Sequence, residues 1–123
     1  MRERRKFARY DVSRYPQLKG GTHNAPIGER MMTMSIGGCG FWAPADTCHL
    51  TVGEKVKLFL HCEGYKSDPV EMPAEVLYIL PQPFESQVGK FYGLRFLDEY
   101  QEEIVRMMEQ LDLEFQAGRL GMA

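Results

Sequence analysis

The sequence predicts a mainly β fold: a six-stranded antiparallel β-barrel followed by one C-terminal α-helix. Up to residue 97 the chain consists of short segments in which apolar and polar residues alternate, separated by turns rich in glycine and proline. After residue 98 the apolar residues recur every three or four positions, which is typical of an amphipathic helix. Because no helix separates successive strands, the strands are expected to run antiparallel, and a small barrel capped by the helix buries both patterns.

The alternation is clearest in residues 54–62, where Val56, Leu58 and Leu60 point to one side and the residues between them to the other. Pro73 favours an edge position or a bulge near the start of the next strand. The six strands are expected at residues 10–19, 29–36, 39–43, 54–62, 70–80 and 90–97.

The helix is expected to begin at an Asp98 N-cap, with Gln101 three residues later, and to stop near Gly118. Ile104 and Leu111 belong to its apolar face. We therefore expect a single domain with three parts: a basic arm at 1–9, the barrel at 10–98 and the helix at 99–117.

The composition is that of a soluble globular chain of 123 residues, with 44% hydrophobic and 26% charged residues. No apolar run is long enough to span a bilayer, and the basic, polar start does not resemble a secretory signal, so we expect a cytoplasmic protein without membrane insertion. The three cysteines, Cys39, Cys48 and Cys62, have no disulfide or CxxC spacing and are expected to be free thiols.

Charge is distributed unevenly. Residues 1–30 hold eight Lys or Arg against three Asp or Glu, whereas residues 31–123 hold seven against fourteen. The basic character is therefore local, which favours a small anionic ligand, an acidic partner or the protein's own acidic body. An acidic barrel would repel a nucleic-acid backbone, so a nucleic-acid partner is not expected.

The basic arm carries Arg4, Arg5 and Arg9 within six residues. The four-residue spacing of Arg5 and Arg9 puts both guanidinium groups on one side of a helical or an extended segment. Two planar guanidinium groups that converge suit a phosphate, a carboxylate or the edge of a guanine.

A second group of polar and small residues lies on the strand at 29–36 and in the turn after it. Ser35 offers a hydroxyl, and Gly37 and Gly38 allow a ligand to approach the backbone. Thr33 precedes Ser35 on the same face of the strand.

These two groups give the chain a resemblance to the PilZ domain family. Arg4-Arg5-Lys6-Phe7-Ala8-Arg9 matches the RxxxR signature of that family, here as RRxxxR. Thr33-Met34-Ser35-Ile36-Gly37-Gly38 aligns with its second signature, [D/N]xSxxG. The resemblance implies a PilZ-like barrel that binds the bacterial second messenger cyclic di-GMP without catalysis, with no cofactor, and that passes ordering of the arm to a partner protein in signalling.

The resemblance also implies roles for single residues. Arg5 and Arg9 would bind phosphate or guanine, and Arg4 would add the charge that a stacked pair of ligands requires. Thr33 departs from the family pattern, because a hydroxyl accepts one bond where Asp or Asn makes a bidentate contact. Losing one charge-assisted bond costs about 1.5–3 kcal/mol, or roughly ten- to hundred-fold in affinity.

Several alternatives stay open. The main one is a PilZ-like protein–protein interaction module with weak or no nucleotide binding. An OB-like barrel for single-stranded nucleic acid is less well supported, because residues 31–123 are acidic and most aromatic residues fall at core positions. A zinc site among the cysteines and histidines and an enzyme built on Ser35 are also less well supported, because the required spacings are missing. The far end of the helix, residues 113–120, is a candidate surface for a homodimer.

Overall fold

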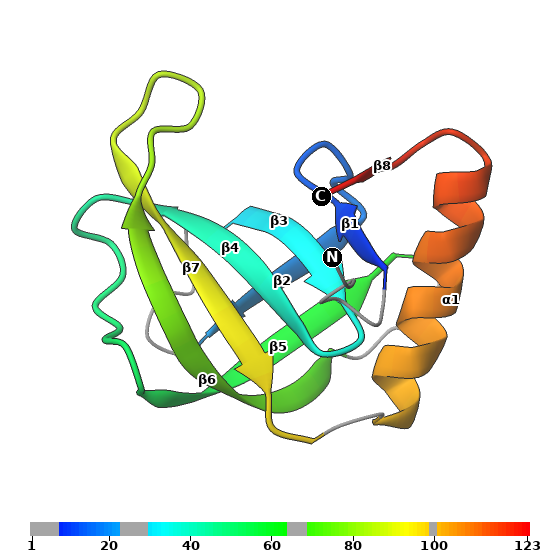
Figure 1. Cartoon of the computed structure of the whole chain (residues 1–123), viewed down its shortest axis with the longest axis horizontal. Coiled ribbons are helices and arrows are strands. Elements are labelled where there is room, and N and C mark those ends of the chain that lie inside the picture. The colour runs from blue at the N-terminus through cyan, green and yellow to red at the C-terminus, as the bar shows by residue number, and fades with distance from the viewer. Residues whose placement is uncertain (1–7, 23–29, 64–68, 99–100) are drawn as a thin grey trace, which may run out of the picture.

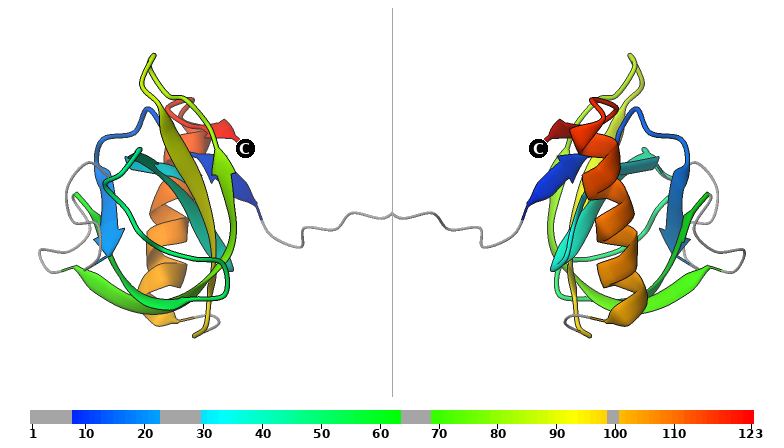
Figure 2. Two further views of the ribbon diagram at one scale, coloured as in Figure 1. Left: turned by 90° about the vertical axis from the view of Figure 1, so that its left-hand side faces the viewer. Right: turned by 90° about the vertical axis from the view of Figure 1, so that its right-hand side faces the viewer.

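The computed structural model describes residues 8–22, 30–63, 69–98 and 101–123, which form a curled antiparallel sheet with one helix across its end (Figures 1 and 2). The mainly β class with a C-terminal helix is therefore confirmed. The elements are β1 (Arg9–Asp11), β2 (Leu18–Thr22), β3 (Arg30–Ser35), β4 (Gly38–Pro44), β5 (Lys55–Cys62), β6 (Val70–Pro81), β7 (Gly89–Phe96), α1 (Glu102–Gln116) and β8 (Gly121–Met122).

The strands follow the order β2-β5-β6-β7-β4-β3-β1-β8, and every hydrogen-bonded pair is antiparallel. The sheet curls so that β2, at one edge, lies against β3. This curling gives a barrel whose inner face carries the alternating apolar residues. One end of it is covered by α1, which buries Ile104, Met107 and Leu111.

The described residues contain eight strands, two more than the sequence predicted. The expected strand at 10–19 is in fact two strands, because a turn at Ser13 and Arg14 and a second one around Pro16 separate β1 from β2. The other addition is β8, a two-residue strand that pairs with β1 after the chain returns from α1. Beyond this pairing, the Ala123 amide donates a hydrogen bond to the Arg9 carbonyl at 2.8 Å.

The start of α1 also differs from the expectation. The N-cap is Gln101, whose side-chain oxygen accepts a hydrogen bond from the Ile104 amide at 3.0 Å, and Asp98 lies outside the helix. The expected stop is correct: α1 ends at Gln116, and Gly118 adopts a positive φ of 81° that a glycine tolerates without strain.

Tyr10 joins the short strand β1 to the helix. Its side chain is 3% exposed, its hydroxyl donates to Asp112 Oδ1 at 2.6 Å, and its ring packs on Phe115 with centroids 5.4 Å apart. Burial, and after it the bond to the Asp112 carboxylate, raises the pKa of Tyr10 to about 12. The strand that begins with Arg9 is thus fixed to α1 by its middle residue.

The three cysteines are buried, and within the described residues none of them forms a disulfide. Within the described residues, no group of three or more His, Cys, Asp or Glu side chains is placed to hold a metal ion. In the same part of the chain, no helix is long and apolar enough to cross a membrane.

Strand β7 passes very close to the turn between β3 and β4. A Cβ atom on Gly38 would lie 2.2 Å from the Leu94 carbonyl oxygen, whereas one on Gly37 would meet nothing within 4 Å. The Gly37 carbonyl accepts a hydrogen bond from the Phe96 amide at 2.9 Å. Gly38 is therefore required by the fold itself, and the position of Gly37 is open.

Replacing Tyr10 by phenylalanine should lower the free energy of unfolding by about 1.5 kcal/mol, because it removes the hydrogen bond to a charged partner.

In the wild type, stability should also fall between pH 10 and about pH 12. The native pKa of Tyr10 lies above its ordinary value of 10.0, so the unfolded state loses this proton first as the pH rises. The fall should be smaller in Tyr10→Phe, as measured by urea unfolding at pH 8 and pH 11. Tyr78→Phe, on the outer surface, is the matched control; equal losses in the two variants would contradict the role given to Tyr10.

Gly38→Ala should destabilise the fold by about 1–3 kcal/mol, because the added methyl group overlaps a backbone carbonyl that cannot move independently. Gly37→Ala should leave stability within about 0.5 kcal/mol of the wild type. Urea denaturation of the two variants side by side measures the difference. Similar stabilities would show that β7 does not approach the turn as closely as the structure has it.

Candidate functional site

The first strand lies beside the strand that carries Thr33 and Ser35. The register places Arg9 opposite Ser35 and Asp11 opposite Thr33. The Val12 amide donates to the Met32 carbonyl at 2.9 Å, so in this register the residues at 10 and 12 form the hydrogen-bonded pairs. The pairs Arg9–Ser35 and Asp11–Thr33 are then non-hydrogen-bonded pairs, which we call narrow pairs. In such pairs the Cα atoms are about 4.5 Å apart and the facing side chains are closest.

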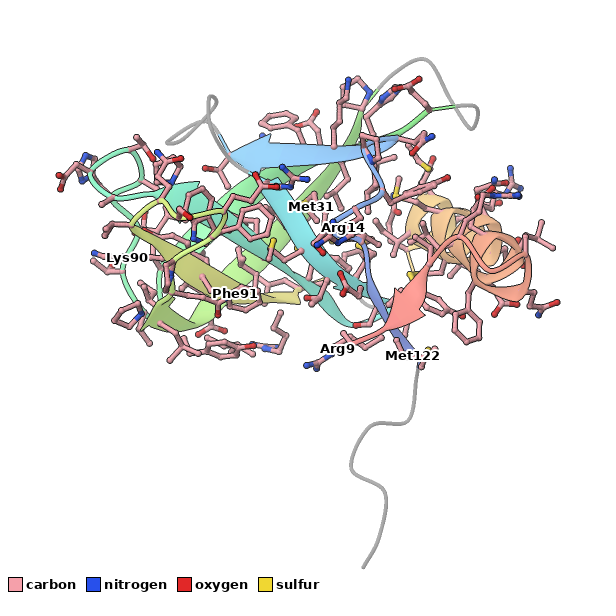
Figure 3. The ribbon with its side chains drawn as sticks, turned by 90° about the horizontal axis from the view of Figure 1, so that it is seen from above. Arg9, Arg14, Met31, Lys90, Phe91 and Met122 are labelled. Carbon is pink, nitrogen blue, oxygen red and sulfur yellow. The ribbon has the colours of Figure 1, made fainter. Side chains whose placement is uncertain are left out.

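Alternation along β1 decides which of its side chains reach the surface. Because Tyr10 points into the core, Arg9 and Asp11 point outward. Figure 3 shows Arg9 at the start of β1, with Met122 of β8 beside it. The outer face of β1 thus presents one cation and one carboxylate next to β3.

The structure brings together five of the seven site residues proposed from the sequence, all near β1, β3 and the turn that follows β3. Arg4 and Arg5 lie outside the described residues. The five that the structure places are Arg9, Thr33, Ser35, Gly37 and Gly38.

The Ser35 hydroxyl fixes the turn, since it donates to the Gly38 carbonyl at 3.2 Å. Its oxygen keeps the capacity to accept a bond from a ligand. The open position of Gly37 leaves room for a flat group against the backbone.

Arg9 is partly exposed, and its guanidinium group makes no hydrogen bond or ion pair with the described part of the chain. A cation in this state has its full hydrogen-bonding capacity available for an anion. The carbonyl of the same residue is engaged by β8, so the backbone is held while the side chain is available.

Two further residues continue the row of Arg9 and Ser35 across the sheet. Arg95 lies opposite Gly38, and Glu75 lies opposite Arg95, with Arg95 Nη2 2.6 Å from Glu75 Oε1. The sequence analysis did not select Arg95. Alternation in β7 shows that Arg95 points away from Leu94 and Phe96, but only the strand register shows that it lies in the same row as Arg9.

A parallel row runs through Thr33 and reaches an apolar surface. Thr33 lies opposite Gly40, Gly40 opposite Gly93, and Gly93 opposite Tyr78. A Cβ atom would lie 2.3 Å from the ring of Phe91 at Gly40 and 2.3 Å from the ring of Tyr78 at Gly93. The two rings therefore lie flat over the glycines, stacked with centroids 6.1 Å apart.

This outer face combines a cation, hydroxyl groups and flat aromatic surface. Arg9 suits an anionic group, Ser35 and Thr33 suit polar atoms, and the rings of Phe91 and Tyr78 suit a planar base. A ligand with both phosphates and purines has the chemistry that this face can bind.

A cavity of about 600 Å³ lies elsewhere, between the β1–β2 connection, β2 and the β6–β7 hairpin. Its two cations, Arg30 and Lys19, are both engaged. Arg30 donates to the Ser13 carbonyl at 2.9 and 3.1 Å, lies 3.6 Å from Glu85 and stacks over Phe84 at 4.8 Å. Lys19 lies 3.8 Å from Glu63. None of the five placed site residues lines this cavity. We therefore assign the site to the outer face of β1 and β3.

The fold is similar to three solved structures. The PilZ domain of YcgR from Escherichia coli, solved with c-di-GMP, matches with a TM-score of 0.68 and 16% identity, over 95% of this chain and 99% of that one. The inhibitor of motility MotI/DgrA from Bacillus subtilis matches with a TM-score of 0.67 and 21% identity, over 89% of this chain and 52% of that one. MrkH from K. pneumonia, solved as a complex with c-di-GMP, matches with a TM-score of 0.66 and 18% identity, over 97% of this chain and 56% of that one. The chain thus spans about half the length of the latter two proteins.

A comparison with curated protein sequences finds no match. A family model described as the PilZ domain, however, matches residues 3–111. The matched range contains Arg4, Arg5 and Arg9, and also β3 and the turn that follows it. The chain belongs to the PilZ domain family.

Proposed function

We propose that the chain binds cyclic di-GMP on the outer face of β1 and β3, without catalysing a reaction on it. The observation that supports the proposal is the narrow pair of Arg9 and Ser35, in which each residue belongs to one of the two stretches that resemble the signatures of the family. The residues proposed to contact the ligand are Arg4, Arg5, Arg9, Thr33, Ser35, Gly37 and Gly38.

The chemistry of the ligand suits this face. Cyclic di-GMP carries two phosphates and two guanines, so its site needs cations that pair with oxygen and also lie flat on a purine. Arg9 does both, and Arg5 is proposed to do so from the arm. Two of the similar structures were solved with c-di-GMP, which supports this ligand over other anions.

The output is proposed to pass through β1. This strand is held by β3, by β8 and, through Tyr10, by α1. Ordering of the arm on the ligand would therefore act on a strand that is coupled to the helix and the C-terminal tail. We propose that a protein partner in the bacterial cytoplasm recognises the ordered arm.

The homodimer expected through the far end of α1 stays a prediction. Leu113 is 62% exposed and available for such a contact. Leu120, by contrast, is buried in the protein's own core as the chain returns to β8. A dimer would therefore use exposed residues such as Leu113 and not Leu120.

The second candidate is a protein interaction module with weak or no nucleotide binding. Two observations favour it: Thr33 stands at the position of the family's acidic or amide residue, and the exposed side chains of Leu77 and Leu80 on β6 offer an apolar surface.

Arg9→Ala should weaken cyclic di-GMP binding by roughly ten- to hundred-fold, because it removes a charge-assisted contact to phosphate or guanine. Isothermal titration calorimetry of the wild type and the variant measures this. Arg106→Ala is the matched control, since Arg106 lies on α1 and pairs with Glu102 at 2.7 Å. Wild-type binding that Arg9→Ala leaves unchanged would place the site elsewhere, and a wild type that does not bind would favour the interaction module.

The wild type should bind two ligands per chain, because Arg4 adds positive charge for a stacked pair with four phosphates. The same titration gives the stoichiometry, and Arg4→Ala should reduce it towards one. A value of one ligand in the wild type would contradict the role of Arg4 while leaving the site itself in place.

A further inference from the structure

The sequence leaves the site short of one acceptor. At the position where the family signature has Asp or Asn, this chain has Thr33, whose hydroxyl accepts a single bond. Guanine presents two adjacent donors on its Watson–Crick edge, the N1–H and the 2-amino group, and its recognition on this edge needs acceptors.

A carboxylate lies directly across the strand from this position. Asp11 of β1 faces Thr33 of β3 in a narrow pair, on the same outer face as Arg9 and Ser35. It is exposed to solvent. β3 has no carboxylate at Thr33, but Asp11 provides one on β1, directly opposite Thr33 on the same outer face.

Only one oxygen of this carboxylate is occupied by the described residues. Asp11 Oδ1 accepts from the Ser13 amide at 2.9 Å and from the Ser13 hydroxyl at 2.6 Å, which closes the turn after β1. These two bonds fix the orientation of the carboxylate. Within the described part of the chain, Asp11 Oδ2 makes no hydrogen bond or ion pair, and the same holds for the Thr33 hydroxyl.

We propose that Asp11 Oδ2 and the Thr33 hydroxyl together form the acceptor pair that recognises a guanine of the ligand. Asp11 is then a specificity-determining residue. It lies on β1 and takes the role of the Asp or Asn that the family signature has on β3, at the position of Thr33. The inference rests on the proposed binding of cyclic di-GMP and adds to it the residue that selects guanine.

Asp11→Asn separates this role from that of closing the turn. The asparagine oxygen can still accept from Ser13, while its NH₂ group replaces Oδ2 and puts a donor where guanine presents donors. The variant should keep the wild-type melting temperature and bind cyclic di-GMP at least tenfold more weakly. Removing a negative charge beside an anionic ligand would by itself strengthen binding, so weaker binding points to the lost acceptor.

Asp46→Asn is the matched control. It makes the same change in charge at an exposed position beyond the far end of β4, where the residue has a positive φ of 69° that asparagine also tolerates. Its affinity should equal that of the wild type.

Cyclic di-IMP, which lacks the 2-amino group, tests the guanine contact itself. The wild type should bind it at least tenfold more weakly than cyclic di-GMP, and this ratio should shrink markedly in Asp11→Asn, because the two changes remove the same interaction. A ratio that is the same in both proteins would overturn the proposal.

Thr33→Asp gives a second, independent readout. In the Asp11→Asn background it should restore binding, because it returns a carboxylate to the surface. In the wild type it should bring little or no gain, because two carboxylates in a narrow pair repel each other. Equal gains in both backgrounds, or unchanged binding in Asp11→Asn, would overturn the inference alone. A wild type that does not bind cyclic di-GMP would overturn the proposed function, and this inference with it.

Discussion

The pairing of β1 with β3 is the interaction on which the rest of the site depends. A strand of three residues has little stability of its own, so β1 exists because its neighbours hold it on every side. β3 and β8 bind its two edges, and α1 binds its inward side chain, Tyr10, through Asp112 and Phe115. β1 is thereby held in a single register, since a slip of one residue would bury Arg9 and expose Tyr10.

This register has a chemical consequence as well as a structural one. It places Arg9 with Ser35 and Asp11 with Thr33, so that a cation and a carboxylate stand side by side on one outer face. Close strand packing adds the rest: Gly38 is required by β7, and Gly40 and Gly93 allow two aromatic rings to lie over the sheet. The candidate binding surface is thus made by the same contacts that hold the sheet together.

Much of the fold was predictable from local patterns. Alternation identified the strands that became β3 to β7, and the change to helical spacing identified α1 and its stop at Gly118, because these patterns depend on residues near one another in the chain. Weakly patterned segments were predicted less well. The stretch at 10–19 is two strands, β8 has no pattern of its own, and the N-cap of α1 is Gln101 because its side chain reaches the Ile104 amide.

The sequence by itself determined the basic stretch, the hydroxyl and glycine turn, and their resemblance to the signatures of one family. Only the tertiary structure decided that Arg9 faces Ser35, that Asp11 faces Thr33, and that Arg95 continues the row of Arg9. The physical reason is that strand register is non-local. The register depends on which side chains the whole barrel buries. Residues that are far apart in the chain become neighbours only when the strands have paired in that register.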